Sequence, residues 1–182
     1  IFVARSTDGG ASWRVLNGDR PIDGVGDYQQ RVPSIAVDAE DTLHVAWYGT
    51  DSRHPAENER QLKYTQSRDG GATWSPWINV AEVPGHAGEE RWQEHPAVYA
   101  RGTAVTIVWE GLDEESGGEE RIKLTRSTDG GRSWTPWRNV SPPSDDGYSR
   151  PALVESGDGR SLYLLAYAER GPVRQIVWKK IA

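Results

Sequence analysis

Short runs of alternating hydrophobic and polar residues follow one another along the chain, and Gly, Pro or Asp residues bound them. Such alternation is typical of half-buried β-strands, and no segment of ten residues has the helical period. The clearest set of four predicted strands comprises residues 33–38, 42–49, 61–67 and 77–82. The same order recurs at 96–100, 104–111, 121–127 and 137–141, and again at 151–156, 161–169 and 174–181. The pattern therefore predicts an all-β fold built from repeated units.

An eight-residue motif that is rich in glycine occurs three times. It reads STDGGASW from Ser6, SRDGGATW from Ser67 and STDGGRSW from Ser127, so the copies begin 60 or 61 residues apart. A long fixed period indicates supersecondary units that stack side by side. Four antiparallel strands per unit, repeated radially, predict a β-propeller.

The repeat divides the chain into four expected units. These are the end of one blade (1–30), two full blades (31–90 and 91–147) and three strands of a last blade (148–182). Two, four, four and three predicted strands are too few to close a ring. An open propeller leaves unpaired strand edges, which invite pairing with another chain. We therefore expect the remainder of a longer chain, or a second copy, to close the ring.

The motif Ser-x-Asp-x-Gly-x-x-Trp resembles the Asp-box, or BNR repeat, of the sialidase (neuraminidase) superfamily. The resemblance covers essentially the whole chain. It implies a sialidase-like six-bladed β-propeller, of which this chain contains about three blades. By this resemblance, the motif joins the third strand of a blade to the fourth.

The residues of the motif have a structural explanation. The aspartates can accept hydrogen bonds from turn N–H groups, the glycines can adopt positive φ, and the tryptophans are expected to pack between outer strands. The positions are Asp8, Gly10 and Trp13, then Asp69, Gly71 and Trp74, and finally Asp129, Gly131 and Trp134. A calcium loop is the alternative, but one carboxylate per motif is too few for a site that takes six or more oxygens.

Composition and charge narrow the range of partners. The net charge of −6 argues against a nucleic-acid partner, and no apolar run is long enough to span a membrane. The absence of cysteine excludes disulfides and thiolate zinc sites. No cofactor is expected, with a surface calcium ion at the acidic loop 111–120 as the alternative. The segment shows no signal peptide, but the resemblance implies a secreted, cell-surface or periplasmic protein.

Strand order places the Asp-box turns on one face of the propeller. The second-to-third loops and the connections between blades share the other face, where sialidase chemistry lies by resemblance, at the central mouth. Residues expected just before the inner strands on that face are Tyr28, Arg31, Trp92, Glu94, His95, Tyr148 and Arg150. Trp47 and Trp109 recur in the second strands, where Tyr167 replaces them, whereas Trp92 has no counterpart. Trp92 therefore either stacks on a sugar or packs within its own connection.

Two stretches, RVP from Arg31 and YSRPALVES from Tyr148, resemble sialidase motifs. The resemblance implies a Tyr nucleophile at Tyr148 and a general acid at Glu57 or Glu59. Glu94 is the candidate base that activates the nucleophile, and the candidate ligand-binding residues are Arg31, Arg53, Trp92, Arg121 and Arg150. The two placements conflict, because Tyr148 follows Arg31 by only two units. A complete catalytic set is therefore not expected in this chain.

Three functions remain open. The first is recognition of a glycan, a glycoprotein or another protein at the central mouth, without a complete catalytic set. The second is the C-terminal half of a retaining exo-α-sialidase that hydrolyses terminal sialic acids. The third is a structural or assembly propeller without a sugar ligand, because a fold alone does not decide function.

Overall fold

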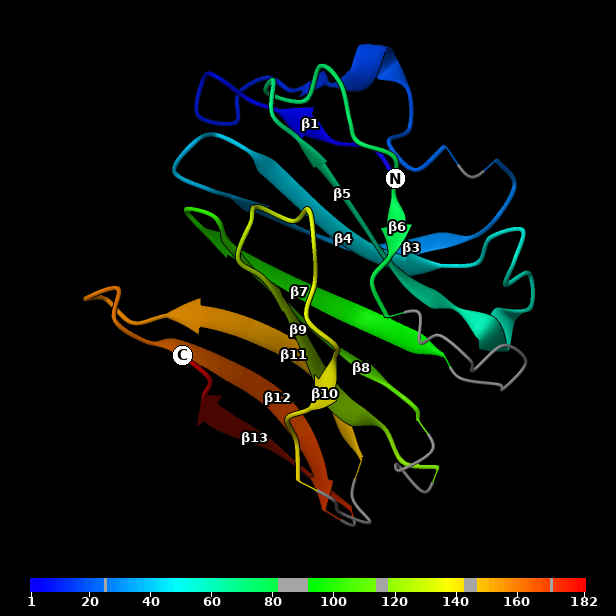
Figure 1. The fold of residues 1–182 in the computed structure, drawn as a ribbon, viewed down its shortest axis with the longest axis vertical. Coiled ribbons are helices and arrows are strands. Elements are labelled where there is room, and N and C mark those ends of the chain that lie inside the picture. Colours follow the sequence, from blue (N-terminus) through cyan, green and yellow to red (C-terminus); the bar gives the residue numbers. More distant parts are fainter. Residues whose placement is uncertain (25, 82–91, 114–117, 143–146, 171) are drawn as a thin grey trace.

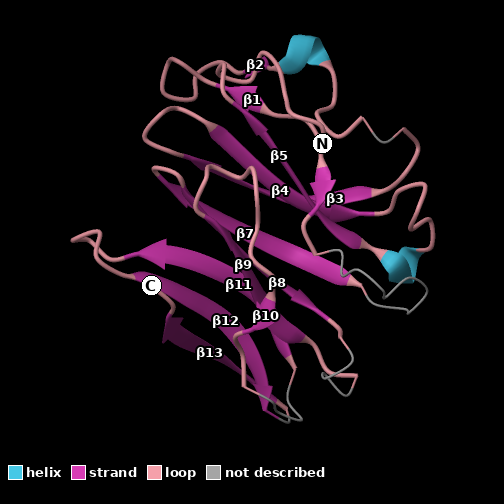
Figure 2. Ribbon diagram, in the orientation of Figure 1, coloured by secondary structure: helices cyan, strands magenta, loops and turns pink. Residues whose placement is uncertain are grey.

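Thirteen strands form four antiparallel sheets that stand side by side (Figure 1). The computed structural model describes residues 1–182 except 25, 82–91, 114–117, 143–146 and 171, and all numbers of strands and sheets refer to that part of the chain. Figure 2 shows two short helical turns between the strands, η1 (Asn17–Asp19) and η2 (Glu57–Glu59). The all-β prediction and the numbers of strands per unit are confirmed.

The sheets follow one another in chain order and are numbered 1 to 4. Sheet 1 contains β1 (Ala4–Arg5) and β2 (Arg14–Val15). Sheet 2 contains β3 (Gln30–Val37), β4 (Leu43–Gly49), β5 (Gln61–Ser67) and β6 (Ile78–Asn79). Sheet 3 contains β7 (Gln93–Arg101), β8 (Ala104–Gly111), β9 (Arg121–Ser127) and β10 (Arg138–Asn139). Sheet 4 contains β11 (Tyr148–Glu155), β12 (Leu162–Arg170) and β13 (Val173–Lys180).

The outermost strands are shorter than the sequence predicts. Strands were expected over 77–82 and 137–141, whereas β6 and β10 contain two residues each. A proline lies two residues before each of them, at Pro76 and Pro136. Because proline has no N–H to donate, pairing with the third strand begins only beyond it.

The inner strands begin three residues earlier than predicted, because each contains a β-bulge beside a proline. The register shifts between Arg31 and Ser34 in β3, and the same shift occurs in β7 and β11. The residues before the prolines are Val32, His95 and Arg150, with φ of 48°, 47° and 49°. A positive φ is costly for a side chain with a Cβ, and a bulge changes the direction of neighbouring side chains.

The hydrophobic core lies between neighbouring sheets. One buried cluster joins β4 and β5 to β7 and β8, and a second joins β8 and β9 to β11 and β12. A third covers Val45 and Trp47 of β4 with Ile1 and Val3. Each sheet is therefore held by the sheet before it and by the sheet after it.

The second-strand tryptophans are paired with glutamines of the inner strands. Trp47 and Trp109 donate their indole N–H groups to the side chains of Gln30 and Gln93, at 2.6 Å in both sheets. The prediction that Tyr167 replaces them in sheet 4 was wrong by one residue, because the strand register places Ala166 there. Register also places Tyr148 where the glutamines stand.

The Asp-box turns connect β1 to β2, β5 to β6, and β9 to β10. In each turn the aspartate accepts an N–H from the residue four positions later at 2.9 Å, and these donors are Ser12, Thr73 and Ser133. The second glycine of each turn, Gly10, Gly71 or Gly131, has φ between 82° and 93°. Hydrogen bonds from Ser12 and Thr73 lower the pKa values of Asp8 and Asp69 to about 2. These contacts are those of a structural turn.

The Asp-box tryptophans differ in their packing. Trp74 and Trp134 are half-buried against the hydrophobic clusters, as expected. Trp13 departs from the expectation, because its side chain is 68% exposed. Its surroundings differ because no sheet lies in front of sheet 1 in the described structure.

None of the helices among the described residues has the length and apolar character that a membrane crossing requires.

Candidate functional site

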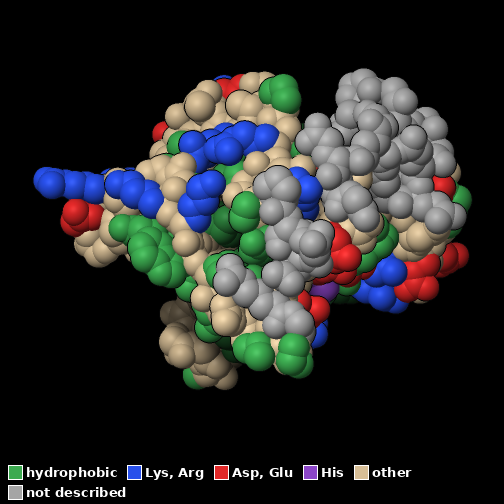
Figure 3. Space-filling model, turned by 90° about the horizontal axis from the view of Figure 1, so that it is seen from below, with side chains coloured by type: hydrophobic (Ala, Val, Ile, Leu, Met, Phe, Trp, Pro, Cys, Tyr) green, Lys and Arg blue, Asp and Glu red, His purple; other side chains and the backbone are tan. Residues whose placement is uncertain are grey.

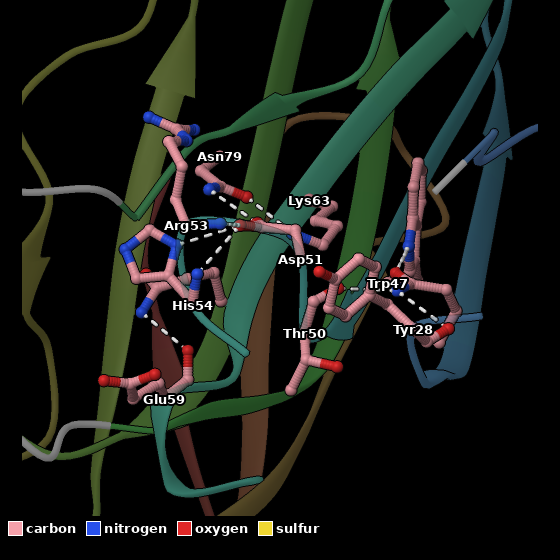
Figure 4. A network of polar contacts seen from close by, with 11 residues as sticks. Tyr28, Trp47, Thr50, Asp51, Arg53, His54, Glu59, Lys63 and Asn79 are labelled. Atoms are coloured by element: carbon pink, nitrogen blue, oxygen red, sulfur yellow. Dashed lines mark hydrogen bonds and ion pairs between the residues drawn. The ribbon is translucent and has the colours of Figure 1, made fainter. Parts of the chain in front are cut away.

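A buried lysine fixes the loop between β4 and β5, which borders the predicted mouth (Figure 4). Lys63 of β5 is fully buried, pairs with the Asp51 carboxylate and donates to Asn79 Oδ1 at 3.0 Å. Its ammonium lies 4.4 Å from the centre of the Trp77 ring. Asp51 also accepts the backbone N–H groups of Arg53, at 2.9 Å, and of His54. The loop that carries Arg53, Glu57 and Glu59 is thus anchored from below.

The same lock recurs in sheet 3. Lys123 is fully buried, pairs with Asp113, donates to Asn139 at 3.0 Å and lies 4.5 Å from the Trp137 ring centre. Asp113 was expected in a solvated acidic loop with calcium as the alternative. The structure instead gives it a lysine partner. Glu114 and Glu115 of that loop lie outside the described residues.

A row of alternating charges crosses the mouth from sheet 2 to sheet 3. Glu57 lies between two arginines, with 3.4 Å to Arg31 and 3.5 Å to Arg60. Arg60, which stands just before β5, pairs in turn with Glu94 of β7. Arg31 and Glu94, both predicted mouth residues, are thereby joined through Arg60 and Glu57.

The row continues from sheet 3 toward sheet 4. His95 Nδ1 lies 3.6 Å from Glu94 and 2.7 Å from Glu110 Oε1. The other oxygen of Glu110 accepts the backbone N–H of Arg150. The His95 ring also lies 5.6 Å from the ring of Tyr48, in a tilted arrangement. Figure 3 shows acidic side chains beside a histidine, with basic side chains nearby.

The carboxyl groups of this row are poorly solvated. Glu94 and Glu110 are only 8% and 3% exposed. Burial raises the pKa of Glu94, although Arg60 and His95 favour its ionised form. Burial, followed by the charges of Glu110 and Glu94, raises the pKa of Glu120 to about 7. The mouth therefore holds both paired carboxylates and one carboxyl that is half-protonated near neutral pH.

Replacing Glu120 with Gln is expected to flatten the pH dependence of stability between about pH 4.5 and 7. The carboxyl ionises near 4.5 in the unfolded chain and near 7 in the fold, so the folded state binds more protons across this interval. Stability of the wild type therefore falls as the pH rises through it. At pH 8 the variant should melt about 2–4 °C higher, which corresponds to about 1 kcal/mol after solvent screening.

Thermal melts at pH 4 and pH 8 test this, with Glu155→Gln on the opposite face as the control. The two proteins should melt alike at pH 4, where the carboxyl is protonated in both states. An equal difference at both pH values would contradict the assignment.

Arg60 and Glu120 are site residues that the sequence reasoning missed. They hold equivalent positions, because their carbonyls accept the N–H groups of Gln93 and Tyr148, each at 2.9 Å. Their separation of 60 residues equals the Asp-box period. Aligning the repeats at that period would have brought them together as two charged residues before the third strand.

The remaining predicted residues are distributed differently. Tyr148 is 6% exposed and belongs to the hydrophobic cluster with Leu164, Ala166 and Ala168. Trp92 is half-buried, and its carbonyl accepts the N–H of Leu112 at 3.2 Å. Arg121 is half-buried at the start of β9, and Arg53 is exposed, with its guanidinium directed away from Asp51 (Figure 4). Glu59 accepts the Ala56 N–H at 3.1 Å and so closes the η2 turn.

Glu94, His95 and Glu110 also form the one group of three possible metal ligands within the described ranges. One ligand atom from each lies within 4.8 Å of the others. Arg60 already neutralises Glu94, and the three donors are fewer than calcium takes. The geometry suits hydrogen bonding to a polar ligand at least as well as coordination of a metal.

A second hollow of about 620 Å³ lies at the opposite end of the inner strands. Its lining includes Ala36, Val98, Arg101 and Glu155. Arg101 and Glu155 pair with each other at 2.8 Å. Its charged lining is thus paired internally, whereas the mouth combines buried carboxyls from different sheets with a raised pKa.

Comparison with known proteins supports the fold. No protein-family model and no curated protein matches the sequence. The GH93 α-L-arabinofuranosidase of Fusarium graminearum, solved with arabinobiose, is similar with a TM-score of 0.73 and 13% identity over 97% of this chain and 52% of that one. The α-L-arabinanase of Penicillium chrysogenum, also with arabinobiose, gives 0.69 and 17% over 98% and 53%. The Hadza microbial sialidase Hz136 gives 0.54 and 20% over 76% and 32%.

The similarity is one of architecture, since each identity lies below 25%. This chain spans about half the length of the arabinan-degrading proteins and a third of the sialidase. Nearly the whole chain superposes on half of a solved propeller. We conclude that the chain has the fold of a partial β-propeller, with its charged mouth at one end of the inner strands.

Proposed function

We propose that the mouth binds a carbohydrate. The observation that carries this proposal is the row of charged groups from Arg31 to Glu110, which joins the inner ends of two sheets. Carboxylates, arginine and histidine are strong hydrogen-bonding groups for sugar hydroxyls, and half-buried Trp92 offers an aromatic surface beside them. The propellers of similar fold include two that were solved with arabinobiose. A secreted, cell-surface or periplasmic location belongs to the same proposal.

A neutral sugar suits this mouth better than a sialic acid. Glu94, Glu110 and Glu120 stand close enough to raise the pKa of Glu120, so the local potential is negative. A sialic acid would bring its own carboxylate into this field. Tyr148, the nucleophile that the sialidase resemblance requires, has its ring in a hydrophobic cluster. We therefore rank exo-sialidase activity below recognition of neutral glycans.

Calorimetric titration with arabinobiose and with sialyllactose tests the proposal. We expect saturable binding of the neutral sugar and about tenfold weaker binding in Glu110→Gln, because one charge-assisted hydrogen bond is worth about 1.5 kcal/mol. Arg31→Ala should weaken binding in the same direction. Asp158→Asn, in the β11–β12 turn on the other face, serves as the matched control and should bind normally.

Two results would overturn carbohydrate binding at the mouth. One is the absence of saturable binding to any of a panel of neutral and acidic oligosaccharides. The other is binding that Glu110→Gln and Arg31→Ala leave unchanged while Asp158→Asn reduces it, which would move the site to the opposite face.

Hydrolysis of a glycoside is the second candidate function. It is favoured by Glu120, whose pKa of about 7 is that of a general acid, beside the carboxyls of Glu94 and Glu110. Release of nitrophenol from an aryl α-L-arabinofuranoside and of methylumbelliferone from an aryl sialoside separates the substrates. Turnover that falls about a hundredfold or more in Glu120→Gln would support this role. Turnover of the sialoside that is lost in Tyr148→Phe would support the sialidase alternative instead.

A further inference from the structure

Neighbouring sheets meet through a joint that is repeated within the chain. At the joint between sheets 2 and 3, Leu62 and Tyr64 of β5 are 0% and 2% exposed. Trp134, the Asp-box tryptophan of sheet 3, packs edge-on against Tyr64 with 4.9 Å between the ring centres. At the joint between sheets 3 and 4, the corresponding residues of β9 are Ile122 and Leu124, which are 0% and 3% exposed.

Sheet 4 presents the same positions to solvent. In β5, Leu62 pairs with Tyr48 and Tyr64 with Ala46. In β13, Ile176 pairs with Tyr167 and Trp178 with Leu165, so register makes Ile176 and Trp178 the counterparts of Leu62 and Tyr64. Ile176 is 68% exposed, Trp178 is 70% exposed and Tyr167 is 40% exposed. We call Tyr167, Ile176 and Trp178 the leading face.

Sheet 1 presents the complementary half of the joint. Trp13 corresponds to Trp134 in the Asp-box but is 68% exposed, and Phe2 of the same sheet region is 61% exposed. A Cβ placed on Gly131 would collide with the Tyr64 ring, whereas one placed on Gly10 meets only Trp13, at 4.0 Å. Gly10 therefore leaves open the space that the Tyr64 side chain occupies at Gly131. We call Phe2, Gly10 and Trp13 the trailing face.

We propose that two copies of this chain join head to tail, with Trp13 of each copy packed against Trp178 of the other. The contact would reproduce the Trp134–Tyr64 contact twice and cover both apolar faces. A head-to-tail contact forms a closed assembly when its rotation closes. Two copies suffice because one copy spans 52–53% of two solved propellers. The proposal commits to a second copy because this chain itself carries both halves of the joint.

The oligomeric state tests the proposal, which does not depend on the sugar ligand. Light scattering coupled to size exclusion should give twice the chain mass of 20.2 kDa. Trp178→Glu should weaken the dimer by roughly thirtyfold or more while the far-ultraviolet circular dichroism stays unchanged, as expected for loss of a central aromatic contact. Val173→Glu is the matched control, since Val173 is also on β13 and 52% exposed but lies outside the leading face.

Cross-linking distinguishes this joint from a contact between two like faces. The chain contains no cysteine, so Trp13→Cys and Trp178→Cys each introduce a single thiol. A short bis-maleimide should link a mixture of the two variants into dimers and leave each variant alone unlinked. A wild-type mass of one chain at micromolar concentration would overturn the proposal and assign the faces to other blades. Linking of Trp178→Cys alone would overturn the head-to-tail arrangement.

Discussion

Replacing Lys63 with Ala is expected to lower the free energy of unfolding by about 3–5 kcal/mol, the usual cost of breaking one side of a buried ion pair. Lys63 has no exposed surface, and its ammonium is shared by Asp51, Asn79 and the Trp77 ring. Burial alone would raise the pKa of Asp51, but the hydrogen bond and charge of Lys63 bring it below the usual value. The variant leaves that carboxylate buried without its ammonium partner.

Urea unfolding of three further variants makes the test specific. Lys123→Ala should cost a similar amount, because Lys123 makes the same contacts in sheet 3. Lys63→Met combined with Asp51→Asn should recover much of the loss, since it removes both charges together. Lys180→Ala, an exposed lysine of β13, should stay within about 0.5 kcal/mol of the wild type. A loss below about 1 kcal/mol in Lys63→Ala would show that the lock does not support the loop.

The lysine lock also shows where sequence reasoning stopped. Lys63 lies in the middle of a predicted strand, and an alternating pattern assigns a charged residue to solvent. Its burial depends on Asp51, Asn79 and Trp77, which are distant in sequence and recur one period later around Lys123. Only a comparison of the repeats, position by position, would have revealed four residue types repeating together at that spacing.

The fold was more predictable than the mouth for a physical reason. Strand number and order follow from local alternation and from the Asp-box period, both of which are visible in the sequence. The mouth depends on bulges at Val32, His95 and Arg150, where a residue before proline adopts positive φ. Those conformations are disfavoured locally, so propensity predicts against them. The resemblance brought Arg31 and Glu94 into view, but their link through Arg60 required the structure.

Tyr148 illustrates the limit of a motif match. The stretch from Tyr148 resembles the start of a sialidase inner strand, yet register equates Tyr148 with Gln30 and Gln93. In the other sheets this position supports a second-strand tryptophan. In sheet 4 the tryptophan is replaced by Ala166, and Tyr148 lies in the same buried cluster. Packing alone thus gives Tyr148 a role that needs no chemistry.

Replacing Gly131 with Ala is expected to destabilise the protein by about 3 kcal/mol, the second large effect. Gly131 has φ of 82°, which an L side chain rarely adopts, and its new Cβ would meet the ring and hydroxyl of Tyr64. Tyr64 is 2% exposed and held by His44 at 2.7 Å and by the edge of Trp134, so it cannot move aside without disturbing the joint.

Gly130→Ala separates backbone strain from the steric clash in this turn. Gly130 also has positive φ, of 71°, but its Cβ would meet only the flexible end of Arg68, at 3.3 Å. Thermal and urea unfolding should therefore show a loss of about 1 kcal/mol for Gly130→Ala and a clearly larger loss for Gly131→Ala. In a Tyr64→Phe background the cost of Gly131→Ala should shrink, because one clashing atom is gone. Equal losses at the two glycines would mean that backbone strain alone, and not the joint between sheets, requires glycine there.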